Sequence, residues 1–491
     1  MLSESNFMIS LSGEFAVNRR VFLARYAGCL GSFALAHLLG EDRAKATAES
    51  PLHPHTLAPA RLLAPTPPHH PARAKSVICL FQHGGPSQMD LFDPKPQLAK
   101  QSGKPFPGKL EAHFHTQVGN LLGSPFKFHR CGQSGMELSE VLPHTAKVAD
   151  ELTLIRSMTT ESVDHEAALR MIHSGKTFAG RPVWGSWVLY GLGSERQDLP
   201  AYVVLSDPGG LPVDGPRNWS SGFLPAVYQG TPFRAAGAPV ANLAMPTGVS
   251  VAARRNQLQL LEEFNATHLA RFPHSSELQA RVSHYELAAR MQTSVPEVLD
   301  ISQESAEIRK LYGLDDPKCG EYAKRCLLAR RLVERGVRFV QIFLNSQPWD
   351  THSKNAEQLK KLCAMTDQPS AALVTDLKRR GLLDSTIVLW TGEFGRLPVS
   401  QGGDGRDHNR HAFSLWLAGG GFKRGYVHGA TDDFSYTAVK DVVTVPDLHA
   451  TLLHTLGFDH TRLTFPHDGR EDSLTDEVVS HAKVIPELLL G

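Results

Sequence analysis

The sequence has no excess of either charge and no long apolar segment. Its 491 residues contain 51 lysines and arginines against 50 aspartates and glutamates, with 41% hydrophobic and 21% charged residues. This globular composition leaves no net field that favours nucleic acid or an anionic membrane surface as a partner. Arg25 and His37 interrupt the apolar stretch near the N-terminus, which is too short and polar for a stable membrane span. We therefore expect a mature protein with no membrane span and no nucleic-acid partner.

Cysteine is also scarce, and its distribution excludes a disulfide framework. Cys29 lies in an N-terminal segment that we expect to be removed, and the others are widely spread at positions 79, 131, 319, 326 and 363. Cys79 sits in an apolar run and is predicted to be a small core residue. No cysteine pattern or haem-attachment motif indicates a blue-copper or haem protein.

The N-terminus reads Asn-Arg-Arg-Val-Phe-Leu-Ala at 18–24, then a mildly apolar stretch, then small residues at 44–48. This resembles a twin-arginine export signal, with Arg19 and Arg20 as the paired arginines. We expect residues 1–48 to be a signal peptide read by the twin-arginine translocase, and the mature protein to be periplasmic or extracellular. Residues 49–74, rich in proline and histidine without periodicity, are predicted to be an extended linker.

From residue 75 to 490, buried-strand patterns alternate with helical patterns. Apolar runs typical of strands occupy 77–81, 152–155, 202–205, 337–344, 386–390 and 413–417, and helical patterns occupy 165–173, 355–380 and 446–456. The alternation predicts an α/β domain with a doubly wound, mainly parallel sheet, whose ligands gather at the carboxyl ends of the strands. A charged, helix-favouring stretch at about 251–335 predicts a helical insertion that packs over the sheet or caps its active edge.

Polar residues follow or precede the buried strands at the positions where a site is expected. They are Asp350 and His352, Glu393 and Arg396, and Asp407, His408 and His411. Carboxylates and imidazoles at neighbouring strand ends are the donors that a divalent cation needs, and such a cation would polarise an ester oxygen. Zn, Ca and Mn all remain open as the metal.

Several motifs in order are similar to a known bacterial family, the domain of unknown function family 1501 of the planctomycete type. They are Phe81-Gln-His-Gly-Gly-Pro-Ser-Gln-Met-Asp-Leu-Phe-Asp-Pro-Lys-Pro96, Trp349-Asp-Thr-His352, Gly392-Glu-Phe-Gly-Arg396, Asp407-His408 and the glycine-rich run from Leu417 to Asp432. The family resembles the alkaline phosphatase and sulfatase superfamily. The resemblance implies hydrolysis of phosphate or sulfate esters at a metal centre.

The superfamily pattern is incomplete in this sequence. Phe394 stands where the superfamily has a histidine after a carboxylate, here Glu393, and Gly84 stands near the expected position of a metal-binding aspartate. His83, Asp90 or Asp93 are the candidate replacements for that aspartate. One metal ion or none is therefore expected rather than two.

The nucleophile is also unusual on this comparison. In sulfatases, the nucleophile opens a helix that a Thr-Gly pair ends, with the glycine ten residues later. Here Ser174-Gly175 corresponds to that pair, so the position of the nucleophile falls on His165. The proline and arginine of the sulfatase motif are missing. A helix N-terminus favours an anion and lowers the pKa of a histidine, so a neutral His165 could attack phosphorus, act as a base or bind metal. Ser162 and Thr160 are the hydroxyl alternatives, and Arg396 is a further catalytic candidate.

Two functions of different classes remain open at this point. The first is an exported metal-dependent hydrolase acting on a small ester or on a sulfated or phosphorylated glycan. The second is a non-catalytic relative that binds anionic glycans or assembles with other exported proteins, which the incomplete ligand pattern supports.

Overall fold

The computed structural model describes residues 63–114, 117–234, 248–272 and 275–491. The predicted signal peptide, and the predicted linker up to residue 62, lie outside the described residues. These described residues belong to one compact unit.

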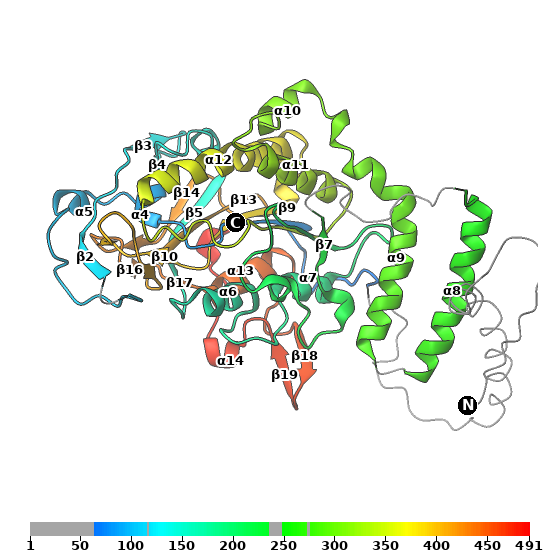
Figure 1. Ribbon diagram of the computed structural model, residues 1–491. Helices are drawn as coiled ribbons and strands as arrows, with labels where there is room; N and C mark the ends of the chain where they lie inside the picture. Colours follow the sequence, from blue (N-terminus) through cyan, green and yellow to red (C-terminus); the bar gives the residue numbers. More distant parts are fainter. Residues whose placement is uncertain (1–62, 115–116, 235–247, 273–274) are drawn as a thin grey trace, which may run out of the picture. The chain divides into compact units, whose positions relative to one another are not determined.

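A single large sheet forms the centre of this unit (Figure 1). Within the described residues it has nine strands in the order β14-β5-β13-β9-β1-β8-β6-β7, with β17 also paired to β5. Only β13 runs antiparallel to its neighbours, and all other pairings in the sheet are parallel. The strands are β1 (Ser76–Phe81), β5 (Leu152–Thr159), β6 (Tyr202–Leu205), β7 (Thr231–Phe233), β8 (Phe339–Ile342), β9 (Thr386–Thr391), β13 (Phe413–Ala418), β14 (Tyr426–His428) and β17 (Val443–Thr444).

Helices cover both faces of the sheet, which confirms the predicted doubly wound α/β fold (Figure 1). One face carries α6 (His165–Ser174), α7 (Trp184–Leu192) and α13 (Val445–Thr455), and the other carries α11 (Gly320–Glu334) and α12 (Asn355–Arg379). Alternate residues of β1 show the two cores. Ile78 and Leu80 pack with the α11 and α12 side, whereas Val77, Cys79 and Phe81 pack with the α6, α7 and α13 side.

Shorter elements decorate the sheet. The small antiparallel pairs are β2 (Val118–Leu121) with β11 (Val399–Gln401), β3 (Phe128–Cys131) with β4 (Met136–Ser139), β10 (Gly395–Arg396) with β12 (His408–Asn409), β15 (Ala430–Thr431) with β16 (Ala438–Lys440), and β18 (Thr464–His467) with β19 (Arg470–Ser473). The short helices are α4 (Gln88–Leu91), α5 (Pro96–Lys100) and α14 (Glu477–Ser480).

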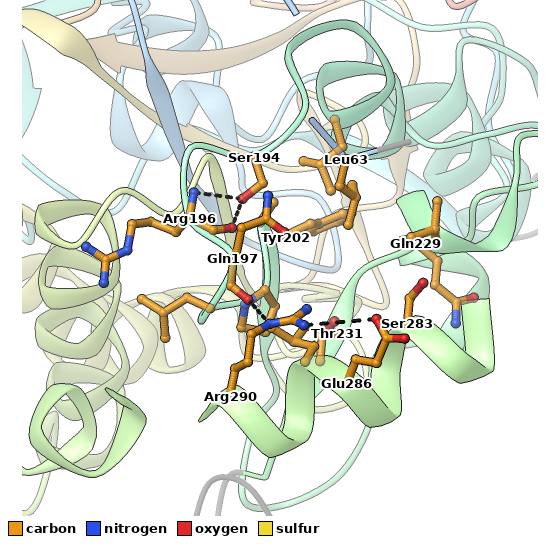
Figure 2. A pocket seen from close by; sticks show the side chains of 16 residues that line it. Leu63, Ser194, Arg196, Gln197, Tyr202, Gln229, Thr231, Ser283, Glu286 and Arg290 are labelled. Atoms are coloured by element: carbon orange, nitrogen blue, oxygen red, sulfur yellow. Dashed lines mark hydrogen bonds and ion pairs between the residues drawn. The ribbon is translucent and has the colours of Figure 1, made fainter. Parts of the chain in front are cut away.

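The predicted helical stretch contains α8 (Val251–Arg271), α9 (Ser276–Leu299) and α10 (Ala306–Tyr312) before α11. A cavity between α9 and the amino end of β6 is lined by Tyr202, Glu286 and Arg290, among others (Figure 2). Arg290 Nε donates to the carbonyl of Gln197 at 2.5 Å. α9 therefore packs at the amino end of β6, whereas α11 covers the sheet itself.

The carboxyl ends of β1, β5, β8 and β9 lie at one edge of the sheet, because these strands share one direction. β13 runs the opposite way, so its amino end lies at the same edge. The loops after β1, β5, β8 and β9 and the segment before β13 therefore meet at this edge.

Two sequence expectations concern redox state and membrane insertion. All five described cysteines are free, and Cys79, Cys319, Cys326 and Cys363 are buried. Among the described residues, no helix is both long and apolar enough to cross a membrane.

Candidate metal centre

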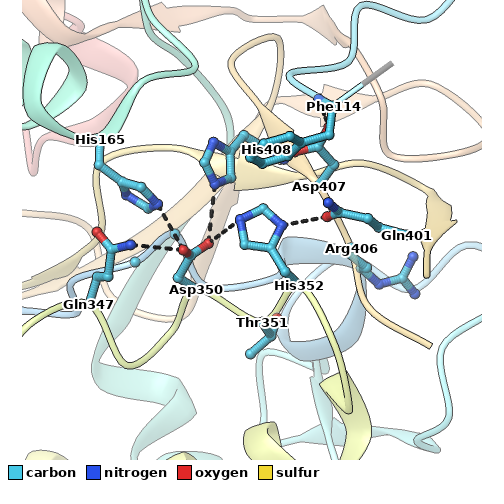
Figure 3. Close-up of polar contacts among 12 residues, drawn as sticks. Phe114, His165, Gln347, Asp350, Thr351, His352, Gln401, Arg406, Asp407 and His408 are labelled. Carbon is cyan, nitrogen blue, oxygen red and sulfur yellow. Dashed lines mark hydrogen bonds and ion pairs between the residues drawn. The ribbon is translucent and has the colours of Figure 1, made fainter. Parts of the chain in front are cut away.

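Asp350, in the loop after β8, is the hub of a polar cluster at this sheet edge (Figure 3). Its Oδ1 lies 2.9 Å from His352 Nε2 and 3.1 Å from His408 Nε2. Its Oδ2 lies 3.3 Å from His165 Nε2 and accepts a hydrogen bond of 2.9 Å from Gln347. Three imidazoles from separate segments thus point one nitrogen each at a single carboxylate.

His408 reaches Asp350 because the chain reverses before β13. The hairpin of β10 and β12 pairs His408 with Arg396, which follows β9. His408 Nδ1 lies 2.6 Å from the carbonyl oxygen of Val163, an acceptor, so this nitrogen carries the proton.

His165 is the first residue of α6, and the helix fixes its position. The Asp164 side chain caps α6 by accepting a hydrogen bond from Ala167 N, and Gly175 ends the helix in the left-handed region at φ 74°. His165 Nδ1 lies 2.7 Å from Glu393 Oε1. Glu393 is itself completely buried and accepts hydrogen bonds from Gly84 N at 2.9 and 3.1 Å.

His352 completes the set on the more exposed side. Its Nδ1 contacts Gln401 Oε1 while its Nε2 faces Asp350. Each of the three histidines therefore has an acceptor at Nδ1 and the same carboxylate at Nε2. An acceptor at the outer nitrogen, which fixes the tautomer and ring orientation, is typical of metal-binding histidines.

Arg396 is fully buried and lies on the interior side of the cluster. Its guanidinium donates to Asp350 Oδ1 at 2.6 Å and to the carbonyl oxygens of Gly85 and Arg406 at 2.9 and 3.0 Å. These contacts fix the orientation of the Asp350 carboxylate, and they direct the Arg396 donors into the protein.

The charges of the cluster shift its pKa values strongly. Burial opposes the charged form of His165, but hydrogen bonds to Asp350 and Glu393 outweigh burial and raise the pKa of His165 to about 9. The lowered pKa predicted from the helix N-terminus is therefore wrong, because two carboxylates outweigh that effect. Burial lowers the pKa of His408 to about 4, although the neighbouring Asp350 carboxylate opposes this shift. Burial also opposes ionisation of Asp350, yet its three histidine partners and Arg396 hold its pKa far below the usual range.

Gly84 explains physically why the expected aspartate is missing from this position. Its φ is +115°, and a Cβ here would lie 2.4 Å from Asp350 N and 2.7 Å from the carbonyl carbon of Trp349. No side chain fits this close backbone approach. A ligand at this position is sterically excluded.

The remaining predicted site residues lie at different distances from the cluster. Asp407 is beside it, and its carboxylate accepts hydrogen bonds from His408 N and Phe114 N, both at 2.8 Å. His83 is completely buried near Glu393 with neither ring nitrogen bonded, and burial lowers its pKa to about 4. Ser162 accepts a hydrogen bond from Asp164 N at 3.0 Å.

Three predicted residues have other partners. Asp90 is fully buried against Arg406, with N–O distances of 2.7 and 3.0 Å. Asp93 accepts hydrogen bonds from Thr431 and Ser435. His411 Nε2 lies 2.7 Å from Glu111 Oε2.

Sequence reasoning missed Gln347, Gln401, His113 and Phe114. The two glutamines support Asp350 and His352, and the rings of His113 and Phe114 pack on His408 and His352. The His-Phe-His run at 113–115 is the signal that could have drawn attention to this segment.

The donor set fits a divalent cation. In the described residues, two groups of three potential ligands have their ligand atoms within 4.8 Å of one another: His165, Asp350 and His408, and His352, Asp407 and His408. His408 belongs to both groups, so its one facing nitrogen could be a ligand of only one cation. Imidazole nitrogen and carboxylate oxygen are ordinary ligands of zinc and manganese.

Comparison with known proteins gives one family and several similar folds. The model of a family described as "Protein of unknown function (DUF1501)" matches residues 74–489. No match to a curated protein was found.

Three chains among the solved structures are similar to this one at low sequence identity. The PsFucS1 sulfatase from Pseudoalteromonas sp. is 12% identical, with 79% of this chain and 68% of that chain covered and a TM-score of 0.33. A protein in the alkaline phosphatase superfamily from Vibrio parahaemolyticus is 11% identical, with 89% and 77% covered and a TM-score of 0.33. The phosphonate monoester hydrolase SpPMH from Silicibacter pomeroyi is 12% identical, with 84% and 77% covered and a TM-score of 0.30.

Proposed function

The chain belongs to the DUF1501 family, and we propose that it is an exported metal-dependent hydrolase of phosphate or sulfate esters. The site that we assign to this function is the cluster around Asp350. The export step rests on the twin-arginine pattern of the first 48 residues.

The observation that carries the proposal is a contact between two acceptors. His408 donates from Nδ1 to Val163, so its neutral ring turns an unprotonated Nε2 toward Asp350 Oδ1 at 3.1 Å. Two acceptors at this distance repel each other, and a cation between them would relieve that repulsion in addition to the positive charge that Arg396 already brings to Oδ1. A divalent cation would supply such charge, with the His408 imidazole and the Asp350 carboxylate as two of the residues that would hold it.

We assign His165, Asp350 and His408 as the ligands of one cation, with His352 at its open side. Bound there, the cation would supply Lewis-acid polarisation of an ester oxygen. Glu393 orients His165 through Nδ1, and Arg396 holds Asp350. The role of His165 in this proposal is that of a ligand, in preference to nucleophile or base, since Glu393 and Asp350 engage both of its nitrogens.

The N-terminus of α6 supports recognition of an anion at the same place. The partial positive charge at the start of this helix favours a tetrahedral oxyanion such as a phosphate or sulfate ester. The side chains of Asp350 and His165 keep 12% and 11% of their surface exposed, and that of His352 28%. The cluster is therefore reachable from solvent on the side of His352.

The test is metal analysis of mature protein purified without chelator or affinity-tag metal, combined with assays on nitrophenyl phosphate and nitrophenyl sulfate. We expect about one equivalent of metal and hydrolysis of at least one ester. Asp350→Ala should lose both, whereas His129→Ala, a change of an exposed histidine on β3, should keep both.

Other outcomes decide against parts of the proposal. Metal-free protein that hydrolyses neither ester after addition of Zn, Ca or Mn would contradict it. Bound metal without hydrolysis of any ester would favour the non-catalytic relative that binds anionic glycans.

A further inference from the structure

A short segment, Glu111–Phe114, runs over the candidate centre, and we refer to it as the strap. The strap is tied to the loop that carries His408. Phe114 N donates to Asp407 at 2.8 Å, and the Glu111 carboxylate lies 2.7 Å from His411 Nε2 and 2.9 Å from Arg410. Both ends of the strap are thus held by residues that flank His408.

The two rings of the strap lie on two histidines of the cluster. His113 stacks on His408 with ring centroids 5.2 Å apart and an interplanar angle of 24°. Phe114 meets His352 edge-on, with centroids 5.4 Å apart and an angle of 84°. Figure 3 shows Phe114 beside Asp407 and His408. The strap therefore forms one wall of the approach to Asp350.

Phe114 leaves 40% of its surface exposed despite this tight attachment. An exposed phenylalanine forfeits much of the free energy that its burial would give. Here the ring is fixed next to a charged cluster, so an apolar surface and an oxyanion site lie side by side. This juxtaposition matches a ligand with an anionic group on one end and a ring with an apolar face on the other.

We propose that the strap selects esters whose alcohol part is a ring, with Phe114 as the contact for that ring. This inference rests on the proposed function and names its substrate class. The shared chemistry of such alcohols is a flat or saturated ring with an apolar face, as in an aryl group or a sugar. Because the ring of Phe114 is already held in place, binding loses little additional side-chain entropy.

Glu111 acts through Phe114 as a positioning residue. Its carboxylate joins the strap to Arg410 and His411, and its N–H donates to the Tyr436 hydroxyl at 3.0 Å. Loss of the carboxylate would remove the contacts with Arg410 and His411 and loosen this end of the strap without removing its ring. His411, which the sequence indicated as a metal ligand, is assigned to this attachment.

Calorimetric titration of the metal-containing protein with phenylphosphonate and methylphosphonate tests the proposal without turnover. The two probes share the anionic group and differ in the ring. Phe114→Ala should weaken phenylphosphonate about three- to tenfold, leave methylphosphonate unchanged, and be rescued by Phe114→Trp. Glucose 6-phosphate and glycerol 3-phosphate, titrated in the same way, distinguish a sugar from an aryl preference.

Two controls separate the strap from the rest of the molecule. Phe178→Ala removes another phenylalanine, 57% exposed, and should change neither affinity. Glu111→Ala should weaken only the ring-bearing probe, and the double variant with Phe114→Ala should be no weaker than Phe114→Ala alone.

The outcomes also separate this inference from the proposed function. The role of the strap would be overturned if Phe114→Ala bound each phosphonate as tightly as the wild type, and glucose 6-phosphate and glycerol 3-phosphate likewise. The oxyanion site would then remain intact. Failure of both phosphonates to bind would count against the oxyanion site itself, and with it against the strap.

Discussion

Glu393 Oε1 lies 2.7 Å from His165 Nδ1, although 228 positions separate the two residues in the chain. The contact joins the end of β9 to the first residue of α6. Glu393 is inaccessible to solvent. The backbone N–H of Gly84, just after β1, donates to both of its carboxylate oxygens. Residues at three strand ends thereby fix the orientation of the His165 ring, with Nδ1 at Glu393 and Nε2 toward Asp350.

The first prediction follows from the raised pKa of His165. The group has a pKa of about 9 in the folded protein against an ordinary value of 6.5. A raised folded pKa stabilises the metal-free protein fully below the unfolded pKa, and this contribution is lost as pH rises through about 9. Urea denaturation of chelator-treated protein between pH 6 and 10 should show this loss. His165→Gln should show a flatter dependence, and an identical pH dependence in the variant would contradict the assignment.

The second prediction separates a ligand from a nucleophile at His165. Removal of a metal ligand lowers the affinity for the metal, typically by well over tenfold. Removal of a nucleophile leaves the metal in place. We expect His165→Ala to lose both metal and esterase activity with its circular dichroism unchanged. An inactive variant that keeps a full equivalent of metal would return His165 to the role of nucleophile or base. A fully active one would move the nucleophile to Ser162 or Thr160.

The third prediction concerns Asp90, a candidate ligand from the sequence that the structure pairs with Arg406. Both side chains have 0% exposure, so removing the carboxylate charge leaves an unpaired buried guanidinium. Asp90→Asn should lower the free energy of unfolding by about 3–5 kcal/mol while the folded protein keeps its metal. Chemical denaturation and metal analysis of the same preparation check both parts. Loss of metal without loss of stability would place Asp90 in the centre after all.

The fourth prediction uses Gly84. Restoring the aspartate of the superfamily by Gly84→Asp should not add a second metal ion, because the first side-chain atom already meets Asp350 N at 2.4 Å. We expect a lower melting temperature and less bound metal, since the displaced backbone carries Asp350. Two equivalents of metal in a folded Gly84→Asp protein would show that the steric argument fails.

The fifth prediction concerns export. The twin-arginine route reads the arginine pair itself, so changing Arg19 and Arg20 together to Lys should retain the precursor in the cytoplasm. Fractionation of cells with an antibody to the mature protein measures the distribution. Normal export of the double variant would refute the assignment of residues 1–48.

The sequence alone determined the sheet and much of its order along the chain. Continuous apolar runs such as Val77–Phe81 can be buried on both faces, and the structure places them in strands with separate cores above and below. The frame from His165 to Gly175 likewise coincides with α6 and its left-handed cap, because local capping chemistry sets those ends. Family membership was also predictable, since it depends on motifs in order and not on contacts.

Only the tertiary structure decided which polar residues meet. Asp90, His411 and His408 are all polar residues in family motifs or next to strands, yet only His408 reaches Asp350, because the hairpin of β10 and β12 sets its register. The His-Phe-His run marks the strap in the sequence, but its attachments span roughly 300 positions and no local pattern encodes them. The raised pKa of His165 has the same origin: a helix end is a local feature, whereas the two carboxylates that outweigh it come from the ends of other strands.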